Sequence, residues 1–345
     1  LHPFANIIYS ETSPNANTWE KSLPLHLQAM LTVSYERHSA VARAKEGGIM
    51  IGRRTILAGM TTGVATGLAA TAVPSALARS RRGGPVIGVQ LYMARDLLAR
   101  DFDGTLAAIA GTGVRHVEFA GFHDRGAPAI RATLAANGLT AVGAHAVRAD
   151  MGDEEIARTI ATCGEIGMDY VIAAVPLVPA LKLPITSKEQ VRAALDQLTV
   201  DDIARTADRF NLIAARVRAA GMHFAYHTHG LDFRRYGARY GFDEMIARCD
   251  PRLVDFELDV GNTIAAGVDP VPYFARLGRR LPLAHLKDWK TPYEPRTWDI
   301  PPSAPIGRGS IDFGAVMRAM RRGGVTHAFI EQEQTPANEV IATIA

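Results

Sequence analysis

The chain is poor in cysteine, with Cys163 and Cys249 as the two examples among 345 residues. Two cysteines are too few for a scaffold held by several disulfides or for a zinc site built from thiolates. One disulfide is left open, although two small buried apolar side chains are the simpler expectation. Any chemistry performed by this chain must therefore rest mainly on other side chains.

The sequence also lacks a strong surplus of either charge, since 38 Lys and Arg face 35 Asp and Glu. Residues 1–82 carry 9 basic and 4 acidic side chains, whereas residues 83–345 carry 29 and 31. A nucleic-acid-binding domain normally presents a basic face. The faintly acidic main part of the chain therefore disfavours a nucleic-acid partner. Its 48% apolar and 21% charged residues are typical of a globular protein.

The front of the chain differs from the rest. Residues 1–49 show no sustained apolar period, and we interpret them as a disordered tail or as an extension upstream of a true start at Met50. Arg53 and Arg54 then precede an uncharged run over residues 55–78, rich in Ala, Gly and Thr and ending in Ser-Ala-Leu-Ala. This order of features is typical of a twin-arginine export signal.

We accordingly expect a signal peptide over residues 50–78 with cleavage after Ala78, a linker over residues 79–85 and a folded domain over residues 86–345. A retained membrane anchor is the alternative, although glycine and threonine leave the run weakly apolar. Export would place the mature protein in the bacterial periplasm or outside the cell. The export machinery would then be one of its partners.

From residue 86 onward, short runs with strand character alternate with stretches of helical period. The expected strands are 86–91, 114–119, 140–145, 170–174, 223–227, 254–258, 283–285 and 328–331. The expected helices are 103–111, 127–137, 153–166, 200–220, 242–249, 271–277 and 312–322. Residues 176–199 and 292–305 are expected to be long loops, and residues 336–345 make a poor closing helix. Eight such units predict a closed (β/α)₈ TIM barrel.

An open doubly wound sheet is the alternative to the barrel. Its usual glycine-rich turn after the first strand is missing, because Tyr92, Met93, Ala94 and Arg95 stand there. The repeat pattern therefore favours the barrel.

The carboxyl ends of most predicted strands carry His, Asp or Glu, which strand interiors usually lack. They are Glu118, His145, His227, His229, Glu257, Asp259, His285, Glu331 and Glu333. In such barrels these ends meet at one mouth, where a buried charge must be paired or bound. Carboxylates and imidazoles together indicate a site for Mn²⁺, Zn²⁺, Co²⁺ or Fe²⁺. A buried ion-pair network is the structural alternative.

Strand alternation places residues two apart on the same side of a strand. His227 and His229 could thus both reach the mouth, and Lys287 would face inward with His285. Lys287 could neutralise an enolate oxygen or shuttle a proton there.

These residues lie in segments that resemble the sugar phosphate isomerase/epimerase group of xylose isomerase-like TIM barrels, in an exported subgroup with a twin-arginine signal. The similar segments are IGVQLY at 87–92, HVEFAG at 116–121, YHTH at 226–229, LDVGN at 258–262, HLKD at 285–288, GRGSIDF at 307–313 and IEQE at 330–333. They span nearly all of the expected mature chain and follow consecutive barrel units.

The resemblance implies one divalent ion, held in that group by an acidic residue of strand five, an Asp of strand six, a His of strand seven and a Glu of strand eight. The last three correspond to Asp259, His285 and Glu331. At strand five His227 takes the place of the carboxylate, with His229 as the fallback. Mn²⁺ is the first choice for the ion, with Zn²⁺, Co²⁺, Fe²⁺ and Mg²⁺ as alternatives.

Catalytic roles follow from the same resemblance. Glu331 is expected to act as acid or base, and His229 or Lys287 to take the second role. Glu118, His145 and Trp289, with His229 and Lys287, are expected to contact a substrate.

The expected function is a metal-dependent isomerase or epimerase that moves a proton next to the carbonyl of a sugar or keto-sugar. Because a strand-five carboxylate is missing, β-elimination of 3-keto-glycosides by a lyase is the alternative. A non-catalytic periplasmic sugar-binding barrel is a second alternative. A homo-oligomer is left open.

Overall fold

A computed structural model of the protein describes residues 83–181, 187–297 and 300–345. The tail expected over 1–49, the signal expected over 50–78 and the first part of the linker expected over 79–85 lie outside these residues. Within the described ranges, no helix has both the length and the apolar character needed to cross a membrane.

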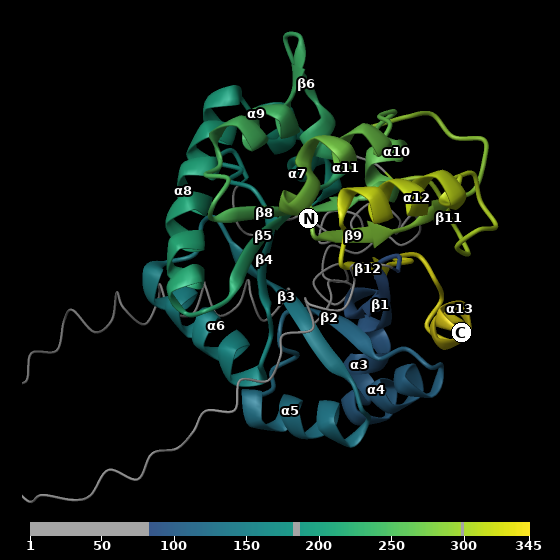
Figure 1. The fold of residues 1–345 in the computed structure, drawn as a ribbon. Helices are drawn as coiled ribbons and strands as arrows, with labels where there is room; N and C mark the ends of the chain where they lie inside the picture. The colour runs from purple at the N-terminus through teal and green to yellow at the C-terminus, as the bar shows by residue number, and fades with distance from the viewer. Residues whose placement is uncertain (1–82, 182–186, 298–299) are drawn as a thin grey trace, which may run out of the picture.

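Eight parallel strands close into a barrel, as the alternating pattern predicts (Figure 1). They are β1 (Val86–Gln90), β2 (His116–Ala120), β3 (Thr140–Arg148), β4 (Tyr170–Val175), β5 (His223–His227), β8 (Val254–Asp259), β9 (Leu283–Leu286) and β12 (His327–Ile330). Around the barrel the order is β1-β12-β9-β8-β5-β4-β3-β2, so each strand pairs with its chain neighbours and β12 closes on β1. The predicted (β/α)₈ fold is confirmed.

Helices surround the strands (Figure 1). The α-helices are α3 (Arg95–Arg100), α4 (Phe102–Gly111), α5 (Ala127–Ala136), α6 (Asp153–Ile166), α7 (Lys188–Asp196), α8 (Val200–Ala219), α9 (Gly241–Arg248), α10 (Val260–Ala265), α11 (Val271–Leu277), α12 (Phe313–Gly323) and α13 (Val340–Ile344). The 3₁₀ helices are η2 (Leu91–Ala94), η3 (Gly230–Phe233) and η4 (Gly278–Arg280). Two small antiparallel pairs join β6 (Arg235–Tyr236) to β7 (Arg239–Tyr240), and β10 (Asp288–Trp289) to β11 (Ser303–Ala304).

Local sequence explains where several helices begin and end. Thr199 and Asp202 form a reciprocal capping box at the start of α8. Gly167 ends α6 with φ of 90°, a left-handed conformation that glycine adopts without strain. The closing helix α13 has five residues and packs against α4, in agreement with the poor helical pattern at the end of the sequence.

The prediction of a loop over residues 176–199 is wrong in part, because α7 lies there. The Ser187 hydroxyl caps it by accepting a hydrogen bond from the Gln190 amide. Val191, Leu195 and Leu198 form a small apolar cluster of their own, separate from the main core. The strongly polar composition of α7 hides this short apolar face in the sequence.

The inside of the barrel is divided into two layers. The apolar layer consists of Val142, Tyr170, Ile172, Ala225, Leu283 and Phe329. Above it, at the carboxyl ends of the strands, lies a layer of buried charged side chains. The apolar layer seals the barrel below these charges.

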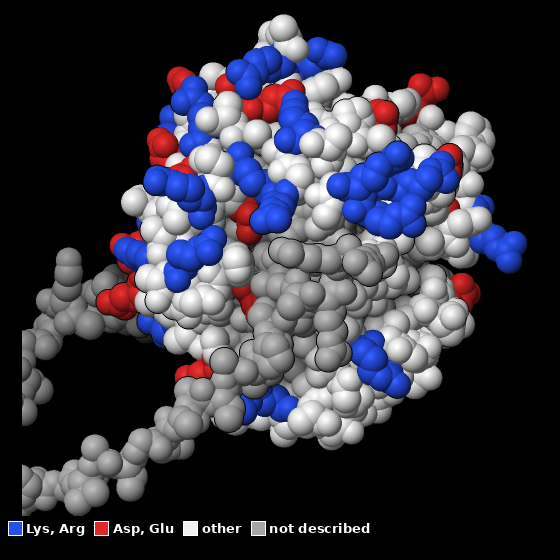
Figure 2. Space-filling model, in the orientation of Figure 1, with Lys and Arg blue, Asp and Glu red and all other residues white. Residues whose placement is uncertain are grey.

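The outer surface has a different distribution of charge. Figure 2 shows basic side chains gathered over α11 and α12, where Arg276, Arg279, Arg318, Arg321 and Arg322 are exposed. Arg276, Arg321 and Arg322 lie in the last turns of their helices, where a positive charge interacts favourably with the helix dipole. Basic side chains thus lie outside these helices, while carboxylates gather within the barrel.

Candidate metal centre

Strand register brings the charged side chains together at the mouth. His227 is level with Glu257 across β5 and β8, and Asp259 is level with His285 across β8 and β9. Residues two apart on a strand point to the same side. Glu257 therefore lies one layer deeper in the barrel than Asp259.

The four side chains that the resemblance assigns to an ion form one group. His227, Asp259, His285 and Glu331 each offer a ligand atom, and these atoms lie within 4.8 Å of one another. All four residues are fully buried. Nδ1 of His285 lies 2.8 Å from Oε2 of Glu331, and Nε2 of His227 lies 3.8 Å from Oδ2 of Asp259. We call these four residues the mouth group.

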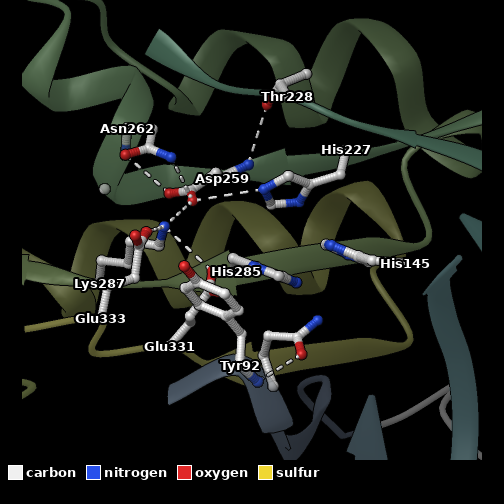
Figure 3. A network of polar contacts seen from close by, with 12 residues as sticks. Tyr92, His145, His227, Thr228, Asp259, Asn262, His285, Lys287, Glu331 and Glu333 are labelled. Atoms are coloured by element: carbon white, nitrogen blue, oxygen red, sulfur yellow. Dashed lines mark hydrogen bonds and ion pairs between the residues drawn. The ribbon is translucent and has the colours of Figure 1, made fainter. Parts of the chain in front are cut away.

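Lys287 faces the same point, as strand alternation predicts (Figure 3). Its Nζ lies 2.9 Å from Oδ2 of Asp259 and 3.1 Å from Oε2 of Glu331, and it also pairs with Glu333. Burial by itself lowers the pKa of this ammonium, but the three carboxylates outweigh burial and raise the pKa well above its ordinary value. Lys287 is therefore a fixed positive charge.

Asp259 is held in place by residues that the sequence reasoning did not single out. The Asn262 amide donates to Oδ1 of Asp259 at 2.8 Å, and the Asn262 side chain donates to Oδ2 at 2.8 Å. The Asp259 amide donates to the Thr228 hydroxyl at 3.1 Å. Burial raises the pKa of Asp259, while Lys287 acts in the opposite direction. The Asn in the LDVGN segment was the available sequence signal.

A second set of charged side chains adjoins the mouth group, and we call Glu118, His145 and Glu257 the floor triad. Nε2 of His145 lies 3.0 Å from Oε2 of Glu118 and 2.8 Å from Oε2 of Glu257. Burial lowers the pKa of His145, but the two carboxylates outweigh it and raise the pKa to about 9. Burial raises the pKa of Glu257, but His285 and His145 lower it to about 2. The floor triad is thus two carboxylates bridged by an imidazolium.

The buried charges suit a cation. Five carboxylates in this region are each at most 3% exposed, namely Glu118, Glu257, Asp259, Glu331 and Glu333. Lys287, also buried, lies beside them. Oε1 of Glu118 and Oε1 of Glu257 are buried without a hydrogen-bond partner among the described residues. Uncompensated buried carboxylates are costly. The mixed nitrogen and oxygen donors of the mouth group fit a divalent first-row transition metal.

The remaining predicted site residues take different places. His229 lies beside His227, with ring centroids 4.6 Å apart, but belongs to neither of the ligand groups found among the described residues. Trp289 is 1% exposed, and its indole N–H donates to the Gly261 carbonyl at 2.7 Å. Trp289 thus packs the loop after β9 against α10. A contact with substrate stays a prediction for both residues.

Glu257 and Glu333 also belong to this region, as the strand-end pattern predicts, although the sequence assigns neither of them to the ion. Both follow the strand-end pattern, since each lies two residues from a predicted ligand, Asp259 or Glu331.

Comparison with solved structures shows the same fold. A sugar phosphate isomerase/epimerase from Parabacteroides distasonis is 22% identical with a TM-score of 0.57, covering 76% of this chain and 95% of that one. A second protein of that description from the same organism is 18% identical, also with a TM-score of 0.57, covering 76% and 91%. The IolI protein, crystallised with a zinc atom, is 15% identical with a TM-score of 0.55, covering 75% and 94%.

A search of curated proteins found no significant match. Residues 106–343, however, match the family described as xylose isomerase-like TIM barrel. This segment runs from within α4 to within α13 and includes the mouth group and the floor triad. The chain belongs to the xylose isomerase-like TIM barrel family.

Proposed function

We propose that this protein is a metal-dependent isomerase or epimerase that moves a proton at the carbon next to the carbonyl of a sugar or keto-sugar. The observation that carries the proposal is the mouth group, in which two carboxylates and two imidazoles offer ligand atoms within 4.8 Å of one another. The surplus of buried carboxylates over Lys287 supports a bound cation. The solved structure of IolI with zinc supports it further, as that protein has the same fold.

The roles of the side chains follow from their contacts. When bound, a divalent ion would polarise the carbonyl and so make the neighbouring C–H more acidic. Lys287 is a fixed ammonium that donates hydrogen bonds and can stabilise negative charge as it develops on the substrate oxygen. Glu331, 3.1 Å from that ammonium, is assigned to move the proton. His229 at the rim is assigned the second acid/base role.

A lyase that eliminates a group from a 3-keto-glycoside is the second candidate. It is favoured by His227, which stands where the resemblance implies a second carboxylate. An imidazole whose lone pair binds an ion cannot also accept a proton there. One base is sufficient for β-elimination, whereas epimerisation by two opposed carboxylates requires both.

Deuterium exchange tests these functions together. We expect deuterium from D₂O to enter the carbon next to the carbonyl of at least one compound in a panel of sugars and 3-keto-glycosides. A chelator should stop the exchange, and Mn²⁺ or a neighbouring ion should restore it. Release of the glycosidic group would favour the lyase. Absence of exchange across the panel would contradict both enzymes and favour a sugar-binding barrel.

We also propose that the protein is exported, on the basis of Arg53, Arg54 and the uncharged run that follows. Mature protein from a bacterial host should then begin near Arg79. Amino-terminal sequencing tests this, and a mature start before Met50 would contradict it.

A further inference from the structure

The floor triad contacts the two histidines of the mouth group. Oε2 of Glu257 lies 3.0 Å from Nδ1 of His227. Oε2 of Glu118 lies 2.7 Å from Nε2 of His285. Both carboxylates are fully buried, and His145 bridges them at 2.8 and 3.0 Å. Each imidazole therefore has one nearest carboxylate, although Oε2 of Glu257 also lies 3.4 Å from Nε2 of His285, and His145 links the two carboxylates.

The other nitrogen of each ring faces the mouth group. Nε2 of His227 lies 3.8 Å from Oδ2 of Asp259, and Nδ1 of His285 lies 2.8 Å from Oε2 of Glu331. The two rings are thus held by opposite nitrogens, Nδ1 in one and Nε2 in the other. An ionised carboxylate only accepts hydrogen bonds, so the ring nitrogen facing it must carry the proton. This leaves the lone pair of His227 on the side of Asp259. His285 faces a carboxylate at both nitrogens, Glu118 at Nε2 and Glu331 at Nδ1. Because Glu331 is itself a proposed ligand, a bound ion would replace the proton between it and Nδ1.

We propose that Glu257 and Glu118 are positioning residues that fix the tautomers and orientations of His227 and His285, so that Nε2 of His227 and Nδ1 of His285 bind the ion. This inference rests on the proposed metal dependence of the site. A carboxylate that accepts a hydrogen bond from a metal-bound imidazole orients the ring and makes it a stronger ligand. Glu118 and His145 thereby act on the ligands, rather than on a substrate as the sequence predicts.

A different arrangement is available to the same side chains. His145, His227, Glu257 and His285 also offer ligand atoms within 4.8 Å of one another. In that group the ion would bind Nδ1 of His227 and Nε2 of His285. It would replace the hydrogen bonds that these nitrogens make to Glu257 and Glu118. The mouth is favoured because two carboxylates, Asp259 and Glu331, join the imidazoles there as ligands, whereas the other group offers Glu257 alone. The two arrangements predict opposite tautomers for His227 and for His285.

The tautomers can be measured in the wild-type protein. Protein labelled with ¹⁵N-histidine and loaded with Zn²⁺ should show, in long-range ¹H–¹⁵N correlation spectra, the proton of His227 on Nδ1 and that of His285 on Nε2. A proton on Nε2 of His227 or on Nδ1 of His285 would overturn the inference. Protein that binds no Zn²⁺ in prior metal analysis would overturn the proposed metal dependence, and the inference with it.

Affinity for Zn²⁺ provides the second measurement. Titration against a competing chelator should show binding weakened about 10–100-fold in Glu257→Gln, and more in Glu257→Leu, since glutamine keeps an oxygen acceptor without the charge. Asp202→Asn is the matched control, because it removes a buried carboxylate that caps α8 and belongs to neither ligand group. Wild-type affinity in Glu257→Gln, or an equal loss in Asp202→Asn, would overturn the inference.

Discussion

On β5, β9 and β12, the apolar layer of the barrel interior and the charged layer above it lie two residues apart. Leu283 precedes His285 on β9, and Phe329 precedes Glu331 at the end of β12; all four are fully buried. Burying an aliphatic or aromatic side chain contributes about 1.5–3 kcal/mol to folding. Burying an ion costs several kcal/mol unless its partners compensate. Burial in the apolar layer therefore stabilises the fold. Burial to the same extent in the charged layer costs free energy and creates a site that can bind a cation.

In the charged layer, buried carboxylates outnumber the buried lysine, and this surplus of negative charge favours a bound cation. Lys287 has three carboxylate partners, and His145 bridges two more. Burial opposes a positive charge on His145 and His285, but the neighbouring carboxylates outweigh it and raise the pKa of both groups. The apolar layer has no corresponding requirement. Substitutions in the charged layer should therefore affect mainly activity, and substitutions in the apolar layer mainly the free energy of unfolding.

The largest effect is expected from a substitution in the charged layer that lowers activity but leaves the free energy of unfolding nearly unchanged. Glu331→Gln should lower the rate of proton exchange by about 10³-fold. Stability should change little, because Lys287 keeps Asp259 and Glu333 as partners. Deuterium exchange and urea unfolding measure the two quantities. Wild-type exchange in the variant would remove Glu331 from its assigned role.

The reverse result is expected in the apolar layer. Ile172→Ala should lower the free energy of unfolding by about 2–5 kcal/mol, because Ile172 is fully buried and its loss leaves a cavity. Zn²⁺ affinity of the folded variant should match that of the wild type. Ile172→Val serves as a graded control, with a loss of about 0.5–1.5 kcal/mol. Weakened Zn²⁺ binding in folded Ile172→Ala would show that the layers are coupled.

A smaller effect is expected from pH at the opposite end of the barrel. Burial, assisted by nearby His116 and opposed by Glu118, lowers the pKa of His327 to about 4. The folded state then binds fewer protons than the unfolded state between pH 4 and 6.5, so stability falls as the pH falls through this window.

The loss from His327 should reach about 2–3 kcal/mol near pH 4. Urea unfolding of the wild type and His327→Gln at pH 7 and pH 4.5 measures it. The variant should lose less stability than the wild type on acidification. Equal losses would mean that His327 titrates normally in the folded protein.

Much of the site could be predicted because barrel chemistry collects at the carboxyl ends of strands. The strand-end pattern and the resemblance together assigned His227, Asp259, His285 and Glu331 to one ion, and the structure brings these four together. Lys287 faces inward as alternation requires. The contacts of Glu118 with His285 could not be predicted, because these residues are 167 positions apart and meet only through the register of the closed barrel.

The amino-acid sequence by itself determined the order of strands and helices and the chemical types at the mouth, because side-chain periodicity and residue type are local properties. The tertiary structure alone decided which nitrogens of the histidines meet carboxylates, how Lys287 shares three acids, and that Glu257 lies beside His227. These arrangements depend on the relative heights of strands that pair across the barrel. The relative heights of the strands are set when the sheet closes and its apolar layer packs. No single segment of the chain determines them.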